Sequence, residues 1–114
     1  MKSEFINDYK FGKITILNKT YSDDIILLNR KVEQKWWRKE GHSLSIEDLN
    51  KVIDFKPDLL IIGTGDSGLM KVPLELYESL NCEVVSLPTS EAVKKYNSEI
   101  KENKKIAGAF HLTC

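Results

Sequence analysis

Hydrophobic and polar residues alternate along the first third of the chain, a pattern typical of antiparallel β structure with one buried face. The alternation predicts three strands, over 11–17, 20–28 and 32–37. Asn18-Lys19 predicts a two-residue turn between the first two strands, because asparagine tolerates a positive φ. In the third strand, Trp36 and Trp37 would point to opposite faces. We therefore predict an N-terminal antiparallel β-meander within residues 1–40.

The hydrophobic spacing becomes helical after residue 45 and then alternates between helical and strand-like segments. Ser45 followed by acidic residues predicts the start of a helix that ends before Pro57. Apolar runs predict strands over 59–62, 83–87 and 106–110. Two helices are expected between them, one over 74–80 opened by Pro73 and one capped by Thr89 or Ser90. A strand-helix-strand-helix-strand order predicts parallel strands with right-handed connections.

These elements predict a single α/β domain over residues 1–114, with the β-meander in 1–40 and a helix followed by a β-α-β-α-β core in 45–114. The expected architecture is a small parallel or mixed sheet flanked by helices. The meander would either complete this sheet or pack against it.

A glycine-rich loop follows the first apolar strand of the core, where Gly63–Gly68 matches the G-x-G-x-x-G pattern of dinucleotide-binding proteins. Residues 69–72 separate this loop from the next helix, so no helix N-terminus would meet a pyrophosphate, and we expect no cofactor. The carboxyl end of such a strand is nevertheless where α/β sheets usually bind ligands. A pocket for a small anion or metabolite is therefore a candidate site, lined by Thr64, Asp66, Ser67 and Lys71, with His42 or His111 as an acid-base group.

A basic and aromatic cluster surrounds the two tryptophans and includes Arg30, Lys31, Lys35, Arg38 and Lys39. Tryptophan and arginine dominate the binding energy of protein interfaces, so Trp37 and Arg38 are the candidate interface residues. Basic residues beside aromatic ones also occur in proteins that bind single-stranded nucleic acid. The whole chain carries 17 Lys plus Arg and 17 Asp plus Glu, and without a positive surplus we expect no nucleic-acid partner.

The remaining composition describes an ordinary globular domain of 114 residues with 41% hydrophobic residues. The absence of an apolar run long enough to span a bilayer, and of an apolar stretch near Met1, predicts a cytoplasmic protein with no membrane partner. His111 and Cys114 could pair as a base and a thiol nucleophile, but a buried structural histidine is the more common alternative. Metal sites usually contain closely spaced ligand pairs, and His111 and Cys114 are the only such pair among the histidines and cysteines of the sequence. We therefore predict no metal site at His42, Cys82, His111 and Cys114.

Asp23 and Asp24 lie within the second predicted strand, and neighbouring side chains on a strand point to opposite faces. They therefore cannot easily form a carboxylate dyad. An aspartate that faces inward needs a charged or hydrogen-bonded partner. The alternative interpretation is that these acids protect a strand edge against aggregation.

Seven short motifs in this order resemble the Mth938-domain family, a domain of unknown function. They are YKFG (9–12), YSDDI (21–25), WWRKEGH (36–42), IIGTG (61–65), LMKVP (69–73), TSEAVKKYN (89–97) and HLTC (111–114). The resemblance covers nearly the whole chain and implies a compact α/β domain with the Mth938-like fold. Members similar to this chain include eukaryotic relatives linked to assembly of respiratory complex I and to adipocyte differentiation. The resemblance implies no catalytic residues.

The leading hypothesis from the sequence is a domain that acts by binding protein, in an assembly or scaffold role or by self-association. The competing hypothesis is a small-molecule or anion-binding enzyme or sensor whose pocket lies at residues 63–71. Of these two, we expect the binding domain rather than the enzyme.

Overall fold

The computed structural model describes residues 4–102 and 104–113, which form two β-sheets and several short helices. The small sheet is antiparallel and consists of β1 (Ile6–Lys10), β2 (Lys13–Ile16) and β3 (Lys19–Tyr21). The main sheet has the strand order β5-β4-β8-β6-β7. Its strands are β4 (Ile25–Leu28), β5 (Lys31–Glu33), β6 (Leu59–Thr64), β7 (Glu83–Leu87) and β8 (Ile106–His111). The helices are the 3₁₀ helix η1 (Ile46–Leu49), α1 (Asn50–Phe55), α2 (Leu74–Ser79) and α3 (Thr89–Glu99).

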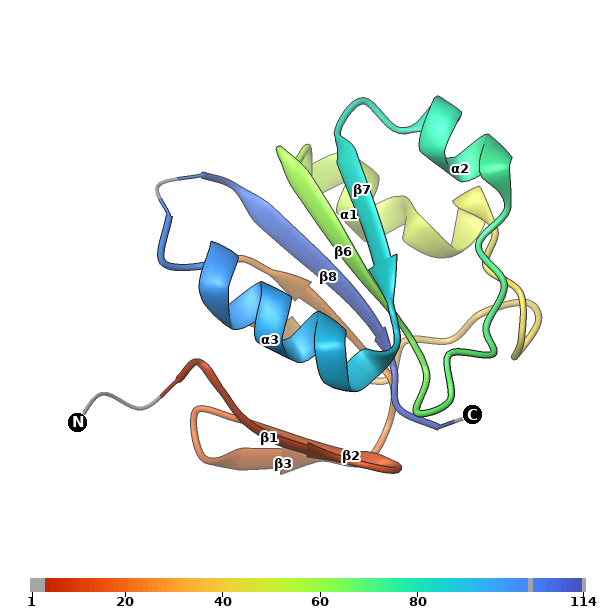
Figure 1. The fold of residues 1–114 in the computed structure, drawn as a ribbon. Coiled ribbons are helices and arrows are strands. Elements are labelled where there is room, and N and C mark those ends of the chain that lie inside the picture. Colours follow the sequence, from red (N-terminus) through yellow and green to blue (C-terminus); the bar gives the residue numbers. More distant parts are fainter. Residues whose placement is uncertain (1–3, 103, 114) are drawn as a thin grey trace.

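The elements are arranged in layers, with α3 between the two sheets and with α1 and α2 on the opposite face of the main sheet (Figure 1). Asn97 of α3 holds the small sheet in place, because its side-chain oxygen accepts from the Ile6 amide at 2.8 Å and its side-chain nitrogen donates to the Ile6 carbonyl at 2.9 Å. Alternate side chains of β6 enter two different cores, one against α3 and one against α1 and α2. This burial on both faces explains the unbroken apolar run in the sequence.

The parallel core predicted from the sequence is confirmed, since β6 runs parallel to both β7 and β8. Strand β4 is antiparallel to β8 and to β5, so the main sheet is mixed. The sequence left two places open for the N-terminal strands, within the main sheet or packed against it, and both occur. Strands β4 and β5 complete the main sheet, whereas β1 to β3 form a separate sheet packed on α3.

The first predicted strand, over 11–17, is wrong in its boundaries. Gly12 has a φ of 77°, a backbone conformation that favours glycine, and it forms the turn between β1 and β2. The next turn is also one residue earlier than predicted. Leu17 and Asn18 have φ values of 49° and 67°, and Lys19 already belongs to β3. Positive φ at both central residues matches the twist of antiparallel strands.

The two other predicted N-terminal strands are too long, for two separate reasons. The strand over 20–28 is divided between the sheets, because residues 22–24 leave the small sheet and Asp24 turns its side chain towards charged partners. The strand over 32–37 ends at residue 33, because Lys35 has a φ of 56°, which a strand does not allow.

One of the two predicted helix caps is observed, and the other is not. The Ser45 amide donates to the Asp48 carboxylate at 2.9 Å, which supports the start of η1. Neither Thr89 nor Ser90 caps α3, since Pro88 precedes its first residue. The hydroxyl of Thr89 instead binds backbone groups at the ends of β6 and β8. Along the part of the chain that the structure describes, no helix is long and apolar enough to cross a membrane.

Candidate functional site

The glycine loop that follows β6 is a compact turn. Gly65 and Gly68 have φ values of 108° and 71°, and the Gly68 amide donates to the Gly65 carbonyl at 3.2 Å. The loop is tied to α3, because the hydroxyl of Thr89 accepts from the Gly65 amide at 2.8 Å. Helix α2, the next helix along the chain, begins only at Leu74, so it does not start within the motif as the dinucleotide fingerprint requires. The helix N-terminus that adjoins the loop is that of α3, where the Thr89 amide donates to the Gly65 carbonyl at 2.9 Å.

The polar side chains of the loop contribute mainly to the fold. Thr64 is buried and its hydroxyl donates to the Leu87 carbonyl at 3.1 Å. Asp66 is exposed and accepts from the Tyr9 hydroxyl at 3.4 Å, while its amide donates to the Thr113 carbonyl at 3.1 Å. Burial, together with the negative charge of Asp66, raises the pKa of Tyr9 to about 12. Tyr9 therefore stays protonated at neutral pH and cannot serve as a base.

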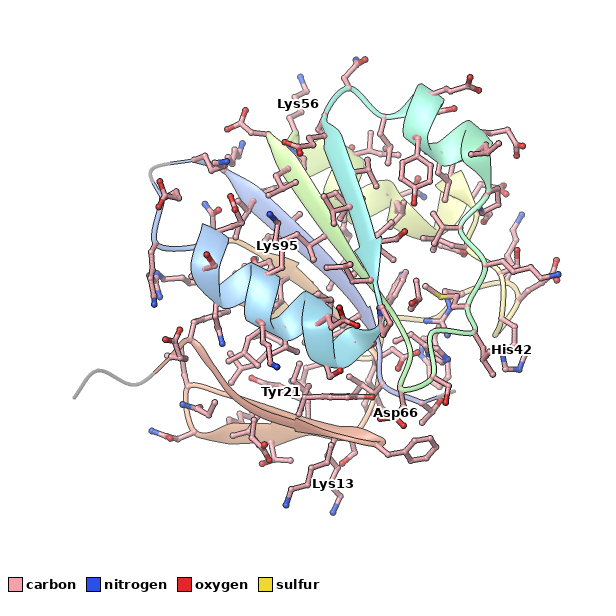
Figure 2. The ribbon with its side chains drawn as sticks, in the orientation of Figure 1. Lys13, Tyr21, His42, Lys56, Asp66 and Lys95 are labelled. Carbon is pink, nitrogen blue, oxygen red and sulfur yellow. The ribbon has the colours of Figure 1, made fainter. Side chains whose placement is uncertain are left out.

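The other predicted pocket residues come from the loop itself, from the segment that contains His42 and from β8. Ser67 and Lys71 are exposed, and the Lys71 amide donates to the His42 carbonyl at 2.8 Å. In Figure 2, His42 lies at the outer edge of the molecule, and Asp66 lies on the loop that follows β6. His111 is buried at the end of β8.

A largely buried group of polar side chains, which we call the polar clamp, consists of Asp24, Arg38 and His111. Arg38 Nη1 donates to Asp24 Oδ2 at 2.8 Å, and His111 Nδ1 lies 2.7 Å from the same oxygen. Arg38 Nη2 lies 2.9 Å from His111 Nδ1 and donates to the Gly41 carbonyl at 3.1 Å. The Arg38 and His111 side chains are only 5% and 7% exposed. The clamp thus joins the segment before β4, the segment after β5 and the end of β8.

The electrostatics of the clamp favour an ionised Asp24. Burial opposes ionisation, but hydrogen bonds from His111, from the Leu112 amide and from Arg38 outweigh it, so the pKa of Asp24 lies below its ordinary value. The Leu112 amide donates to Asp24 Oδ1 at 2.8 Å. Arg38 Nε and His111 Nε2 are buried from solvent and have no hydrogen-bond partner within the described residues. The hydrogen bonds of the clamp hold three segments of the chain together.

The segment over residues 34–41, which we call the Trp37 loop, is the most exposed aromatic feature of the described chain. Trp36 is buried, and its indole N–H donates to the Asp48 carbonyl at 2.8 Å. The Arg38 guanidinium lies over the Trp36 ring, 4.8 Å from its centre. Trp37 is 78% exposed. The opposite orientations predicted for the two tryptophans are observed, although the segment is not a strand.

Arg38, named with Trp37 as a candidate interface residue, has a side chain that is only 5% exposed. Its guanidinium is buried because Asp24 and the Trp36 ring provide a charged partner and an aromatic surface that compensate for lost hydration. Arg38 therefore stabilises the Trp37 loop from its buried side, through its contacts with Asp24 and the Trp36 ring.

Two hollows lie beside the loop and share its residues 35–37. The first has a volume of about 250 Å³ and is lined by Ser22, Asp23, Asp24, Lys35, Trp36, Trp37, Arg38 and Gly41. The second has a volume of about 320 Å³ and is lined by Ile26, Glu33, Gln34, Lys35, Trp36, Trp37, Glu47, Asp48, Asn50 and Lys51. Trp37 is thus an exposed side chain between two concave surfaces.

Most of the basic cluster predicted from the sequence is neutralised by acidic partners. Lys31 and Lys39 form ion pairs with Glu33 at 3.3 Å and with Glu47 at 2.7 Å, while Arg38 pairs with Asp24 as described. The positive and negative charges around Trp37 are therefore balanced. This surface provides little of the net positive potential that attracts phosphate groups.

Cys82 and the two histidines, which lie in the described part of the chain, belong to no metal-binding group there. Within residues 4–102 and 104–113, no three His, Cys, Asp or Glu side chains are placed to hold an ion. Burial, followed by the charge of Asp58, raises the pKa of the Cys82 thiol, so this thiol is a poor nucleophile at neutral pH. Cys114, considered with His111 as a nucleophile, lies outside the described residues.

The sequence did not predict that Asp24, Arg38 and His111 form one cluster, although it predicted that an inward-facing aspartate needs a partner. His111 meets Asp24 because β4 pairs with β8, whereas Arg38 returns to Asp24 after the hairpin of β4 and β5.

Comparison with known proteins identifies related sequences and structures. The profile of DUF498, described as a protein of unknown function (DUF498/DUF598), matches residues 6–111. The conserved hypothetical protein PH1505 from Pyrococcus horikoshii OT3 is 29% identical, with a TM-score of 0.83 and 100% of both chains covered. The protein MT938 is 27% identical, with a TM-score of 0.81, 98% of this chain covered and 100% of that chain. An Mth938-like domain protein from Bordetella pertussis is 13% identical, with a TM-score of 0.70. The match covers 96% of this chain and 85% of that chain. At this identity the similarity shows the fold alone.

Proposed function

The chain belongs to the DUF498/DUF598 family of proteins of unknown function, as its resemblance to Mth938-domain proteins predicted, and we propose that it is a protein-binding domain whose main contact residue is Trp37. The exposure of Trp37 carries this proposal. A tryptophan that is 78% exposed leaves a large apolar surface in water, which a binding partner would remove.

The surroundings of Trp37 support binding because they hold the loop in one conformation. On one side, Trp36 is fixed by its bond to the Asp48 carbonyl, and on the other, Arg38 is fixed by Asp24. Lys35 keeps a left-handed backbone conformation, which costs an ordinary residue about 1 kcal/mol or more and is often found at functional sites. A contact residue on a rigid loop loses little conformational entropy when it binds.

The size of the expected contribution can be worked from the side chain. A tryptophan buries about 150–250 Å² when it enters an interface, which at about 25 cal/mol per Å² corresponds to roughly 4–6 kcal/mol before ordering costs. Substitution of such a residue by alanine typically costs about 2 kcal/mol or more, equivalent to roughly a 30-fold weaker affinity.

The test compares proteins captured from cells of the source organism by the wild-type chain, by Trp37→Ala and by Phe11→Ala. Phe11 is 64% exposed and lies in the turn between β1 and β2, so it is a matched exposed aromatic. We expect Trp37→Ala to lose its specific partner and Phe11→Ala to retain it, with both variants keeping the wild-type melting temperature. Equal capture by the wild-type chain and Trp37→Ala would contradict the proposal.

The competing hypothesis of a small-molecule site at residues 63–71 receives less support from the geometry. The hydroxyl of Thr64 donates to a backbone carbonyl of the fold, and His111 is buried in the polar clamp. Thermal-shift measurements with phosphates and carboxylates still test this alternative directly, because any ligand of the folded state raises the melting temperature.

A further inference from the structure

The first hollow carries one positive and one negative side chain that the rest of the described chain leaves unpaired. Asp23 and Lys35 are both exposed and line this hollow beside Trp37. Within residues 4–102 and 104–113, neither forms a hydrogen bond or ion pair. The other charges of the hollow, Asp24 and Arg38, already neutralise each other. A partner with one cation, one anion and an apolar group would complement this hollow.

A second copy of this chain supplies all three groups by identity. In a twofold-symmetric contact every pairing occurs twice, so Lys35 of each copy would meet Asp23 of the other. The volume also favours a side chain over a metabolite. About 250 Å³ is below the roughly 300–1,000 Å³ of typical small-molecule pockets, but the hollow is open and can receive one large side chain.

We propose that the Trp37 surface binds a second copy of the same chain. Trp37 of each copy packs against the first hollow of the other, and two reciprocal Lys35–Asp23 ion pairs fix the orientation. This inference rests on the proposed protein-binding function and names the partner. The hollow has a rigid base, because Trp36 and Arg38 are buried and hydrogen-bonded, so the contact requires little rearrangement of either copy.

Charge exchange between copies provides a direct test. Asp23→Lys leaves two cations at the contact, and Lys35→Glu leaves two anions, so each variant alone brings like charges together. An equimolar mixture restores both pairs, because the cation introduced at position 23 of one variant faces the anion introduced at position 35 of the other, while the native Lys35 faces the native Asp23. We expect sedimentation equilibrium to show a wild-type dimer, at least tenfold weaker self-association of each single variant, and recovery of dimerisation in the mixture.

Two further variants control for folding and for general charge effects. Lys13→Glu reverses an exposed charge on the small sheet, away from the Trp37 loop, and should leave the dimer unchanged (Figure 2). Trp37→Ala should give a folded monomer. All four changes are at exposed side chains, so circular dichroism and melting temperature should match the wild-type chain.

The outcomes separate this inference from the proposed function. A wild-type chain that stays monomeric up to about 1 mM, or a mixture that does not regain the dimer, overturns self-association. If the monomeric chain nevertheless captures another protein in a Trp37-dependent manner, the protein-binding function stands with a different partner. A dimer that Trp37→Ala leaves unchanged contradicts both.

Discussion

Replacement of Asp24 by alanine should destabilise the fold strongly, because it removes the shared acceptor of the polar clamp. The variant loses hydrogen bonds from Arg38 Nη1, His111 Nδ1 and the Leu112 amide, at 2.8, 2.7 and 2.8 Å. It also leaves the charge of Arg38, whose side chain is only 5% exposed, without its carboxylate. Removal of one partner from a buried ion pair typically costs about 3–5 kcal/mol.

Urea unfolding at pH 7, followed by tryptophan fluorescence, measures this loss. For a domain of this size, about 3–5 kcal/mol corresponds to a melting temperature lower by roughly 10–20 °C. Asp23→Ala is the matched control, because the neighbouring carboxylate is exposed and unpaired within the described residues, and it should change the unfolding free energy by less than about 0.5 kcal/mol. Both variants are measured at a concentration low enough that the wild-type chain is monomeric.

The pH dependence gives a second and independent readout. The pKa of Asp24 is lower in the folded chain than in the unfolded chain, so its stabilisation is fully present above the unfolded value of about 3.9. As the pH falls through the folded pKa, the carboxylate becomes protonated in both states and this stabilisation is lost. The difference between wild type and Asp24→Ala should therefore narrow below pH 4. A loss of less than about 1 kcal/mol at pH 7, or a gap that widens in acid, would refute the role assigned to Asp24.

Three further predictions concern other buried groups. Thr89→Val keeps the side-chain shape but leaves the Gly65 amide and the His111 carbonyl without their side-chain partner, so unfolding in urea should show a loss of about 1–3 kcal/mol, whereas Ser90→Ala at the next, exposed position should be nearly neutral. Gly63→Ala would place a Cβ 2.8 Å from the Thr89 hydroxyl and should cost about 1–3 kcal/mol by thermal melting, whereas Gly41→Ala meets nothing within 4 Å and should not. The raised pKa of Cys82 predicts that its thiol reacts slowly with a thiol reagent at pH 7 and that the rate increases until well above pH 9. The rate is measured on a variant whose C-terminal cysteine is changed to serine. A rate that levels off below pH 9 would contradict the raised pKa.

The sequence determined the second half of the fold well because local signals and tertiary packing agree there. The apolar run that became β6 is buried on both faces, and the periodic segment after Pro88 became α3. In the N-terminal third the same reasoning placed strand boundaries wrongly. Positive φ values at Leu17 and Lys35 end or interrupt alternating segments, and neither residue type announces such a conformation.

The sequence also indicated that one tryptophan of the pair would face outward and that an inward aspartate would need a partner. Only the tertiary structure decided that Asp24 meets Arg38 and His111, and that Arg38 is buried beneath the Trp37 loop. These choices depend on strand pairing between segments more than 80 residues apart. Local patterning specifies which face of an element is apolar, but it cannot specify which distant charges that face brings together, because this depends on the register of the whole sheet.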